Sequence, residues 1–297
     1  MRPASAILLL LASSSLWAAA PQRAPRGKTL EGEIRRFALA GFELRQKASA
    51  VLPGGKRLLA MVFGRPDGSS FRLTVHEIEK TARLIHFEPS VASIRFAPIH
   101  DGGEIPDLIG DGSRVLATIV EFPGFQQRLL VLMRYAGGKL IRIGRPLESA
   151  EFEDIALDGR LEIVSHERPL GQFFSLSCDS FFTMAQTARR TRIHAFESGG
   201  LRTVSAEFPA FYRAHMSNLE AELASNNPAK TGHYGEYLGA ALSLYFDYEE
   251  TGRRKEGWER LRGAFQLPAA APGKVRDCMR EMGSVLRRKL NIPPEWD

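Results

Sequence analysis

The sequence has few of the residues and runs on which many functions depend. Only 2 of its 297 residues are cysteines, Cys178 and Cys278, so a disulfide-rich scaffold and a Cys-x-x-Cys site are excluded. After the first 20 residues no run is long and apolar enough to span a membrane as a helix. The Gly-x-Ser-x-Gly elbow, the phosphate-binding loop and the His-Glu-x-x-His zinc motif are also absent. We therefore predict that the protein is not an enzyme.

The composition is that of a globular protein. Hydrophobic residues make up 44% and charged residues 25% of the chain, which excludes a disordered chain and leaves room for a sizeable core. Forty Lys and Arg against 34 Asp and Glu give a net charge of +6, and we expect this excess to be spread along the chain. Its densest clusters are solvated faces or contacts to an anionic polymer: Arg189, Arg190 and Arg192; Arg253, Arg254 and Lys255; Arg287, Arg288 and Lys289.

The first 20 residues have the features of a signal peptide. A positive charge at Arg2 precedes an uncharged apolar stretch, residues 6–17, and small residues at 18–20 suit a signal peptidase. Pro21 hinders cleavage, so an uncleaved anchor stays open as an alternative; no cysteine is available there for lipid attachment. We expect residues 21–33 to be a linker and the protein to be periplasmic or secreted, which argues against a nucleic-acid partner.

The apolar pattern changes its period near residue 206 and predicts two domains. Residues 34–206 show short apolar runs between Gly, Pro and Asp, typical of strands. Residues 207–297 show apolar spacings of three and four, which predict four helices in two hairpins. The predicted strands are 57–63, 71–78, 83–87, 92–99, 114–122, 128–135, 139–143, 160–166, 191–196 and 201–206.

Three segments of the β-region repeat one pattern. Gly55, Gly112 and Gly159 are each followed by a basic or polar residue and an apolar strand, at offsets of 57 and 47 residues, which is the size of a propeller blade. A hairpin follows each of them, with Gly-Gly turns at 137–138 and 199–200. Each unit predicts a small antiparallel sheet, and stacking of the units supplies the core.

The turns before two of these glycines resemble a known repeat. The segment 107–112, Asp-Leu-Ile-Gly-Asp-Gly, and the segment 154–164, Asp-Ile-Ala-Leu-Asp-Gly-Arg-Leu-Glu-Ile-Val, are similar to the Asp-rich turn of FG-GAP/VCBS-type repeats, the blades of integrin-α-like β-propellers. The resemblance implies a secreted or envelope protein that binds Ca²⁺. Ile109 and Ala156 replace the middle carboxylates, so the implied ligands are Asp107, Asp111, Asp154 and Asp158. The alternative is that these aspartates are turn residues that accept backbone N–H bonds.

Three units are few for a closed ring. The fold class that we predict is mainly β, with blade-like antiparallel repeats in a partial propeller or a sandwich, followed by an α-helical domain. Residues 31–50 are expected to hold one further strand pair. The helices are expected to cover the exposed edge of the sheets.

The helical region has a weaker resemblance of its own. Residues 234–242, followed by Tyr245, Gly252 and Trp258, are similar to tetratricopeptide-like helical hairpins, which bind peptides in a groove. The alternative is an ordinary helical cap.

The two cysteines allow two interpretations. In an oxidising compartment Cys178 and Cys278 can pair and tie the β-region to the helices. Alternatively Cys278 is a small buried hydrophobe, because it shares a helical stripe with Val275, Met279, Met282 and Leu286.

These observations favour an exported, non-catalytic binding module without a cofactor, whose partner is a protein or a glycan of the cell envelope. The rival is a hydrolase of an envelope polymer that acts through histidines or an acidic loop. The carboxylates of that loop are Glu148, Glu151, Glu153 and Asp154.

Overall fold

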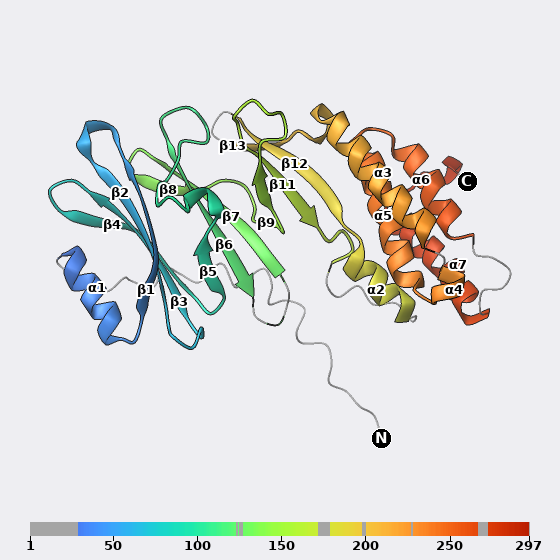
Figure 1. The fold of residues 1–297 in the computed structure, drawn as a ribbon, viewed down its shortest axis with the longest axis horizontal. Helices are drawn as coiled ribbons and strands as arrows, with labels where there is room; N and C mark the ends of the chain where they lie inside the picture. The colour runs from blue at the N-terminus through green and yellow to red at the C-terminus, as the bar shows by residue number, and fades with distance from the viewer. Residues whose placement is uncertain are drawn as a thin grey trace, which may run out of the picture. The chain divides into compact units, whose positions relative to one another are not determined.

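The structure, a computed structural model, describes residues 29–122, 124, 127–171, 179–197, 200–226, 228–266 and 273–296 (Figure 1). The predicted signal peptide and most of the predicted linker lie outside these residues. Three antiparallel sheets are followed along the chain by a helical region, which confirms the predicted fold class. Among the described residues no helix is both long and apolar enough to cross a membrane.

The first two sheets are antiparallel meanders. The first contains β1 (Glu43–Val51), β2 (Arg57–Gly64), β3 (Phe71–Ile78) and β4 (Ala82–Ser90), in that order. The second contains β5 (Ser93–Phe96), β6 (Arg114–Phe122), β7 (Gln127–Ala136) and β8 (Lys139–Arg142), with β9 (Leu147–Glu148) paired to β7.

The third sheet follows the same plan. Its order is β10 (Glu151–Glu153), β11 (Glu162–Glu167), β12 (Arg190–Glu197) and β13 (Gly200–Thr203). β9 and β10 were not predicted from the sequence, and β1 lies where a strand pair was expected without bounds.

The three glycine-anchored strands hold equivalent places. β2, β6 and β11 are each the second strand of their sheet, so the predicted repeat is confirmed at the level of strand order. Gly55, Gly112 and Gly159 have φ angles of 76°, 81° and 83°, in the left-handed region that residues with a Cβ rarely adopt. The shared Gly is therefore a requirement of the turn that starts the second strand.

The described residues contain no closed propeller, because the three sheets are separate open meanders. The blade-like arrangement is therefore open. Within the second sheet, β6 is buried over six consecutive residues, Val115–Val120, so both faces of this strand are covered.

The chain divides into two compact units, and the second sheet contributes to both. The first unit contains residues up to Pro106, Thr118–Phe125 and Tyr135–Ile141. Within it β5 contacts β2 and β3, and the Phe96 N–H donates to Gln46 Oε1 at 2.7 Å. The Tyr135 hydroxyl donates to the Glu77 carboxylate, and burial together with this bond raises the pKa of Tyr135 to about 12. The first two repeats therefore pack against each other within this unit.

The first unit also holds an unpredicted helix, α1 (Leu30–Leu39), which overlaps the end of the predicted linker. The Thr29 hydroxyl accepts the N–H of Gly32 at 3.1 Å and starts the helix. Phe37 packs on Phe63 of β2 with ring centroids 4.7 Å apart. Residues 31–50 thus form a helix and one strand; the expected strand pair is wrong.

The second unit contains Asp107–Ala117, Gln126–Arg134 and Arg142–Asp297. Its helices are α2 (Asp179–Thr187), α3 (Pro209–Ser225), the single-turn α4 (Pro228–Thr231), α5 (Tyr234–Glu250), α6 (Arg254–Ala264) and α7 (Gly273–Lys289). α5 contacts α2, α3 and α6 and is buried along most of its length, so it is the central helix of this region.

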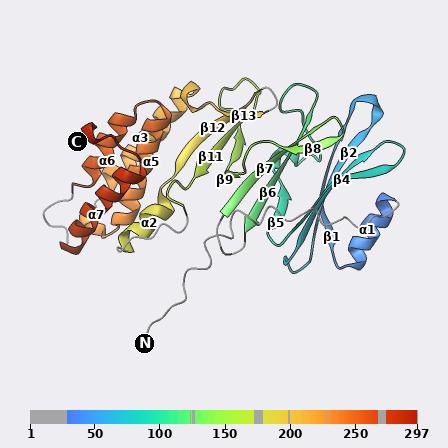
Figure 2. The same ribbon diagram turned by 180° about the vertical axis from the view of Figure 1, so that it is seen from behind.

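The helices pack on a face of the third sheet, so the expected covering of a sheet edge is wrong. α5 contacts β12, an inner strand (Figures 1 and 2). Val164 and Ile193 of the sheet form one buried cluster with Tyr212 of α3 and Leu244 of α5. The Tyr212 hydroxyl donates to the Thr191 carbonyl at 2.9 Å. The sheet needs this cover because its apolar face would otherwise meet water.

Charged side chains add to this contact. Arg190 and Arg192 of β12 both donate to the Glu250 carboxylate, at 2.8 and 3.0 Å. The guanidinium of Arg190 also lies 4.8 Å from the ring centroid of Phe246. Two arginines of the predicted basic cluster 189–192 therefore pair with carboxylates of this chain.

Cys278 lies in α7 and is disulfide-bonded; the other cysteine of the sequence, Cys178, lies outside the described residues. Cys278 is only partly buried against the cluster of α5, α6 and α7, and because it is disulfide-bonded the alternative of a small buried hydrophobe is wrong.

Candidate functional site

The first aspartate turn binds its own backbone. Oδ2 of Asp107 accepts the N–H of Gly112 at 2.7 Å, and Oδ1 accepts that of Gly110 at 2.8 Å. Oδ1 of Asp111 accepts the N–H of Ser113 at 2.9 Å, and its other oxygen pairs with Arg134 of β7. Bonds from Ser113, together with Arg134, lower the pKa of Asp111.

The second aspartate turn repeats this geometry at the same spacing. Asp154 accepts the N–H groups of Asp158 and Gly159 at 3.0 and 2.9 Å. Asp158 accepts the N–H of Arg160 at 2.9 Å and also binds its guanidinium, which lowers the pKa of Asp158. Donors therefore point at both carboxylates of each turn, and an arginine stands beside the second carboxylate.

This geometry does not fit Ca²⁺. The ion needs six to eight oxygen ligands, whereas each turn offers two carboxylates, and the positive charge of Arg134 or Arg160 pairs with the second of them. Among the described residues no three His, Cys, Asp or Glu side chains are grouped to hold a metal. The observed bonds match the alternative, in which the aspartates are turn residues.

We expect Ca²⁺ to leave the stability of the protein unchanged. Millimolar CaCl₂ or a chelator should shift the melting temperature by less than about 1 °C, whereas Asp154→Ala should lower it by about 2–4 °C because two turn hydrogen bonds are lost. Glu153→Ala, at the exposed neighbouring position, is the matched control. A Ca²⁺-dependent rise that Asp154→Ala removes would contradict this assignment.

Three of the four carboxylates of the rival hydrolase have separate partners, and Glu153 is exposed. Glu148 accepts from Arg168 at 2.7 Å, and Glu151 from Arg128 at 3.0 Å. Asp154 is occupied by its own turn. This arrangement ties the edge of the third sheet to its neighbours.

Three histidines of the β-region form hydrogen bonds with hydroxyl or backbone carbonyl groups rather than with carboxylates. Ser165 Oγ lies 3.0 Å from His194 Nε2, but Ser165 is 0% exposed and Thr203 takes the position that a carboxylate holds in a catalytic triad. Burial lowers the pKa of His194 to about 4. His100 bonds the Glu104 carbonyl at 2.7 Å, and His166 bonds Thr191 at 3.0 Å.

One buried ion pair joins α3 to α5. His215 Nδ1 lies 2.6 Å from Oδ2 of Asp247, whose side chain is 0% exposed. The bond to Asp247 raises the pKa of His215, and burial raises the pKa of Asp247. The other oxygen of Asp247 is buried and has no hydrogen-bond partner.

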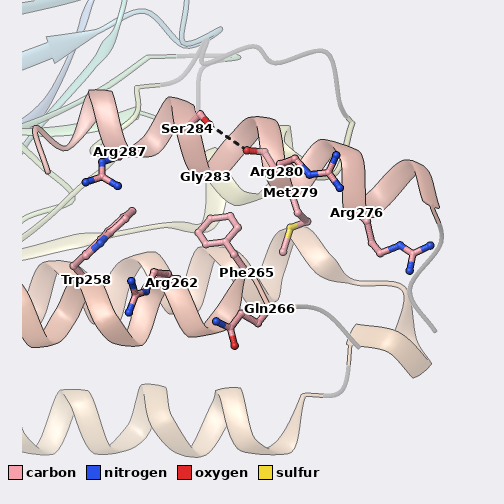
Figure 3. A pocket seen from close by; sticks show the side chains of 10 residues that line it. All are labelled: Trp258, Arg262, Phe265, Gln266, Arg276, Met279, Arg280, Gly283, Ser284 and Arg287. Carbon is pink, nitrogen blue, oxygen red and sulfur yellow. Dashed lines mark hydrogen bonds between the residues drawn. The ribbon is translucent and has the colours of Figure 1, made fainter. Parts of the chain in front are cut away.

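The candidate site is a groove between α6 and α7, with a cavity volume of about 530 Å³ (Figure 3). We call it the α6–α7 groove. Apolar side chains from both helices form its floor, and arginines from both helices stand around it. Its side chains are Trp258, Arg262, Phe265, Gln266, Arg276, Met279, Arg280, Ser284 and Arg287, with Gly283 beside them.

The positive charge of the chain is concentrated in these helices. Residues 254–289 contain ten Lys and Arg against four Asp and Glu. The excess of basic over acidic residues in this segment equals the net charge of the whole protein, +6, so the rest of the chain has no net charge. The expectation that the positive charge is spread along the chain is wrong. A charge of this sign beside a cavity favours an anionic ligand.

Three groups in the groove have unused hydrogen-bonding capacity within the described part of the chain. The indole N–H of Trp258 is buried and has no hydrogen-bond partner, although the side chain lines the groove. Arg262 forms no ion pair within the described part of the chain, and Arg280 has only an exposed pair with Asp277 at 3.7 Å. The exposed guanidinium groups of Arg262 and Arg280 can therefore donate to an acceptor in the groove.

The sequence predicted the basic cluster 287–289, of which Arg287 lines this groove, but missed the groove itself. Arg276 and Arg280 lie one turn apart on α7, and Trp258, Arg262 and Phe265 recur at spacings of four and three on α6. This helical spacing was the signal in the sequence that could have indicated the groove residues. It does not indicate that this face of α6 packs beside this face of α7.

No protein-family model matches the chain, no curated protein is similar to it, and no solved structure matches its fold.

Proposed function

We propose that the protein is an exported, non-catalytic interaction module that holds an anionic partner of the cell envelope, a protein or a glycan, in the α6–α7 groove. The observation that carries the proposal is a cavity lined by four arginines in the two helices that contain the whole net charge of the chain. Binding needs no reacting group, and the groove offers donors and apolar contacts.

Export is supported by two observations. The first 20 residues have the pattern of a signal peptide, and the disulfide on Cys278 is of a kind that persists in oxidising compartments. We place the protein in the periplasm or outside the cell, where nucleic acid is not the partner.

We further propose that the three sheets are degenerate repeats of the FG-GAP/VCBS type that have lost their cation. The glycine turns and the common strand order support this origin. In the two turns that have aspartates, Arg134 and Arg160 bind the second carboxylate. The tetratricopeptide-like resemblance covers α5 and the start of α6, so it concerns a different helical hairpin from the α6–α7 groove.

A charge-reversal experiment tests the groove. Arg262→Glu with Arg280→Glu reverses two arginines of the α6–α7 groove. Lys255→Glu with Arg288→Glu makes the same change in charge on the same helices at exposed positions outside it. We expect partners captured from envelope extracts to fall at least about tenfold, or 1.4 kcal/mol, with the first pair and to stay within about twofold with the second. Equal loss in both would refute a specific groove.

A further inference from the structure

The arginines of the α6–α7 groove are spread along its length. Arg276, Arg280 and Arg287 span twelve residues of α7, or about 16 Å of helix, and Arg262 stands opposite on α6. One phosphate or carboxylate reaches only one or two of them. Several negative groups along an extended ligand match this spacing, and a chain of about five to six residues in extended form covers it.

The floor of the groove separates a peptide from a glycan. Sugars stack on exposed aromatic faces, but Trp258 and Met279 are each only 4% exposed, and Phe265 is partly buried. The floor therefore offers apolar edges between charged groups. A peptide that carries both carboxylates and aliphatic side chains complements this alternation of charged and apolar groups.

We infer that the α6–α7 groove binds an extended acidic peptide segment of a partner protein, whose carboxylates pair with Arg262, Arg276 and Arg280 and whose aliphatic side chains lie on the Phe265 and Met279 floor. This inference rests on the proposed function and names its ligand class. Arginine suits the role because its planar guanidinium binds a carboxylate through two parallel N–H bonds.

The tryptophans of the chain provide a direct assay. The sequence has only Trp17, Trp258 and Trp296, so a full chain with Trp17→Phe and Trp296→Phe reports on the groove alone. The probe is the blocked hexapeptide Glu-Glu-Leu-Glu-Glu-Leu. Its controls are the same peptide with Gln for Glu, the same peptide with Ser for Leu, and an oligogalacturonate of similar length, which is anionic but has neither amides nor aliphatic side chains.

The Glu-Leu peptide is expected to change the Trp258 emission saturably. Its affinity should be at least about tenfold above those of the Gln and Ser peptides and of the oligogalacturonate. The affinity for this peptide should fall at least about tenfold in the variant with Arg262→Glu and Arg280→Glu. It should stay within about twofold in the variant with Lys255→Glu and Arg288→Glu. In the wild type it should weaken as the salt concentration rises.

The other outcomes separate the two proposals. Equal binding of the Glu-Leu and Ser peptides, groove-dependent binding of the oligogalacturonate alone, or no binding of any probe overturns the acidic-peptide inference. In each of these cases the proposed function stands if capture from envelope extracts still depends on Arg262 and Arg280. If that capture is also unaffected by the groove variants, both proposals fail.

Discussion

Replacing His215 by leucine is expected to lower the free energy of unfolding by about 3–5 kcal/mol, which is the usual cost of breaking a buried ion pair. The substitution removes the imidazole that lies 2.6 Å from the Asp247 carboxylate, which is 0% exposed and has one oxygen without a hydrogen-bond partner. Denaturation in urea measures the loss. His86→Leu, a change at a half-buried histidine beside Glu88 on β4, is the control and should cost less.

The double variant His215→Leu with Asp247→Leu separates the buried charge from simple packing. If the unpaired carboxylate causes the loss, the double variant should recover most of it, because an apolar pair of similar volume often replaces a buried ion pair at little cost. Single and double variants of equal stability would contradict the explanation.

The same pair gives the wild type a pH dependence. Folding raises the pKa of His215 above 6.5 and that of Asp247 above 3.8, so the folded state binds these protons more tightly than the unfolded state. The contribution of His215 is fully present below pH 6.5 and is lost as the pH rises through its raised pKa. Wild-type stability should therefore fall with rising pH relative to the double variant. Glu250 and His166 also act on this pair and are unchanged in both proteins.

Gly257→Val is expected to lower the free energy of unfolding by about 2–3 kcal/mol, the cost of overpacking a tight contact. A Cβ at Gly257 would lie 2.6 Å from the Cβ of Tyr248 and 3.1 Å from the carbonyl oxygen of Tyr245. Both atoms are close to the backbone of α5, so α6 must move away. Thermal or urea unfolding measures the change.

Gly263 provides the matched control on the same helix. A Cβ there meets nothing within 4 Å, and valine is not worse than glycine in an exposed helix interior. Gly263→Val should therefore stay within about 0.5 kcal/mol of the wild type. A similar loss in both variants would show that the close approach of α5 and α6 is not the cause.

The regular elements were largely predictable because their signals are local. The predicted strands 71–78 and 114–122 coincide with β3 and β6, where alternation or an apolar run is bounded by turn residues. β1 was expected only as part of a strand pair without bounds, because only Ala48 and Ala50 of its nine residues are buried and its sequence carries little apolar pattern. The prediction for 201–206 ran too far, since β13 ends at Thr203.

The candidate site was predictable only in part. The hydrogen bonds of Asp107 and Asp154 reach no more than five residues along the chain, so the sequence could offer turn residues as one of two alternatives. The pairing of Glu148 with Arg168 and of His215 with Asp247 joins residues 20 and 32 positions apart. No local pattern indicates such pairs.

By itself the sequence determined the repeat, the glycine turns and the change from strands to helices, because periodicity and backbone constraint act between near neighbours. The tertiary structure alone decided that the helices cover a sheet face, that the aspartates are occupied by N–H groups, and that the arginines of α6 and α7 stand around one cavity. These properties depend on which surfaces meet, and that is settled by the burial of apolar area over the whole chain.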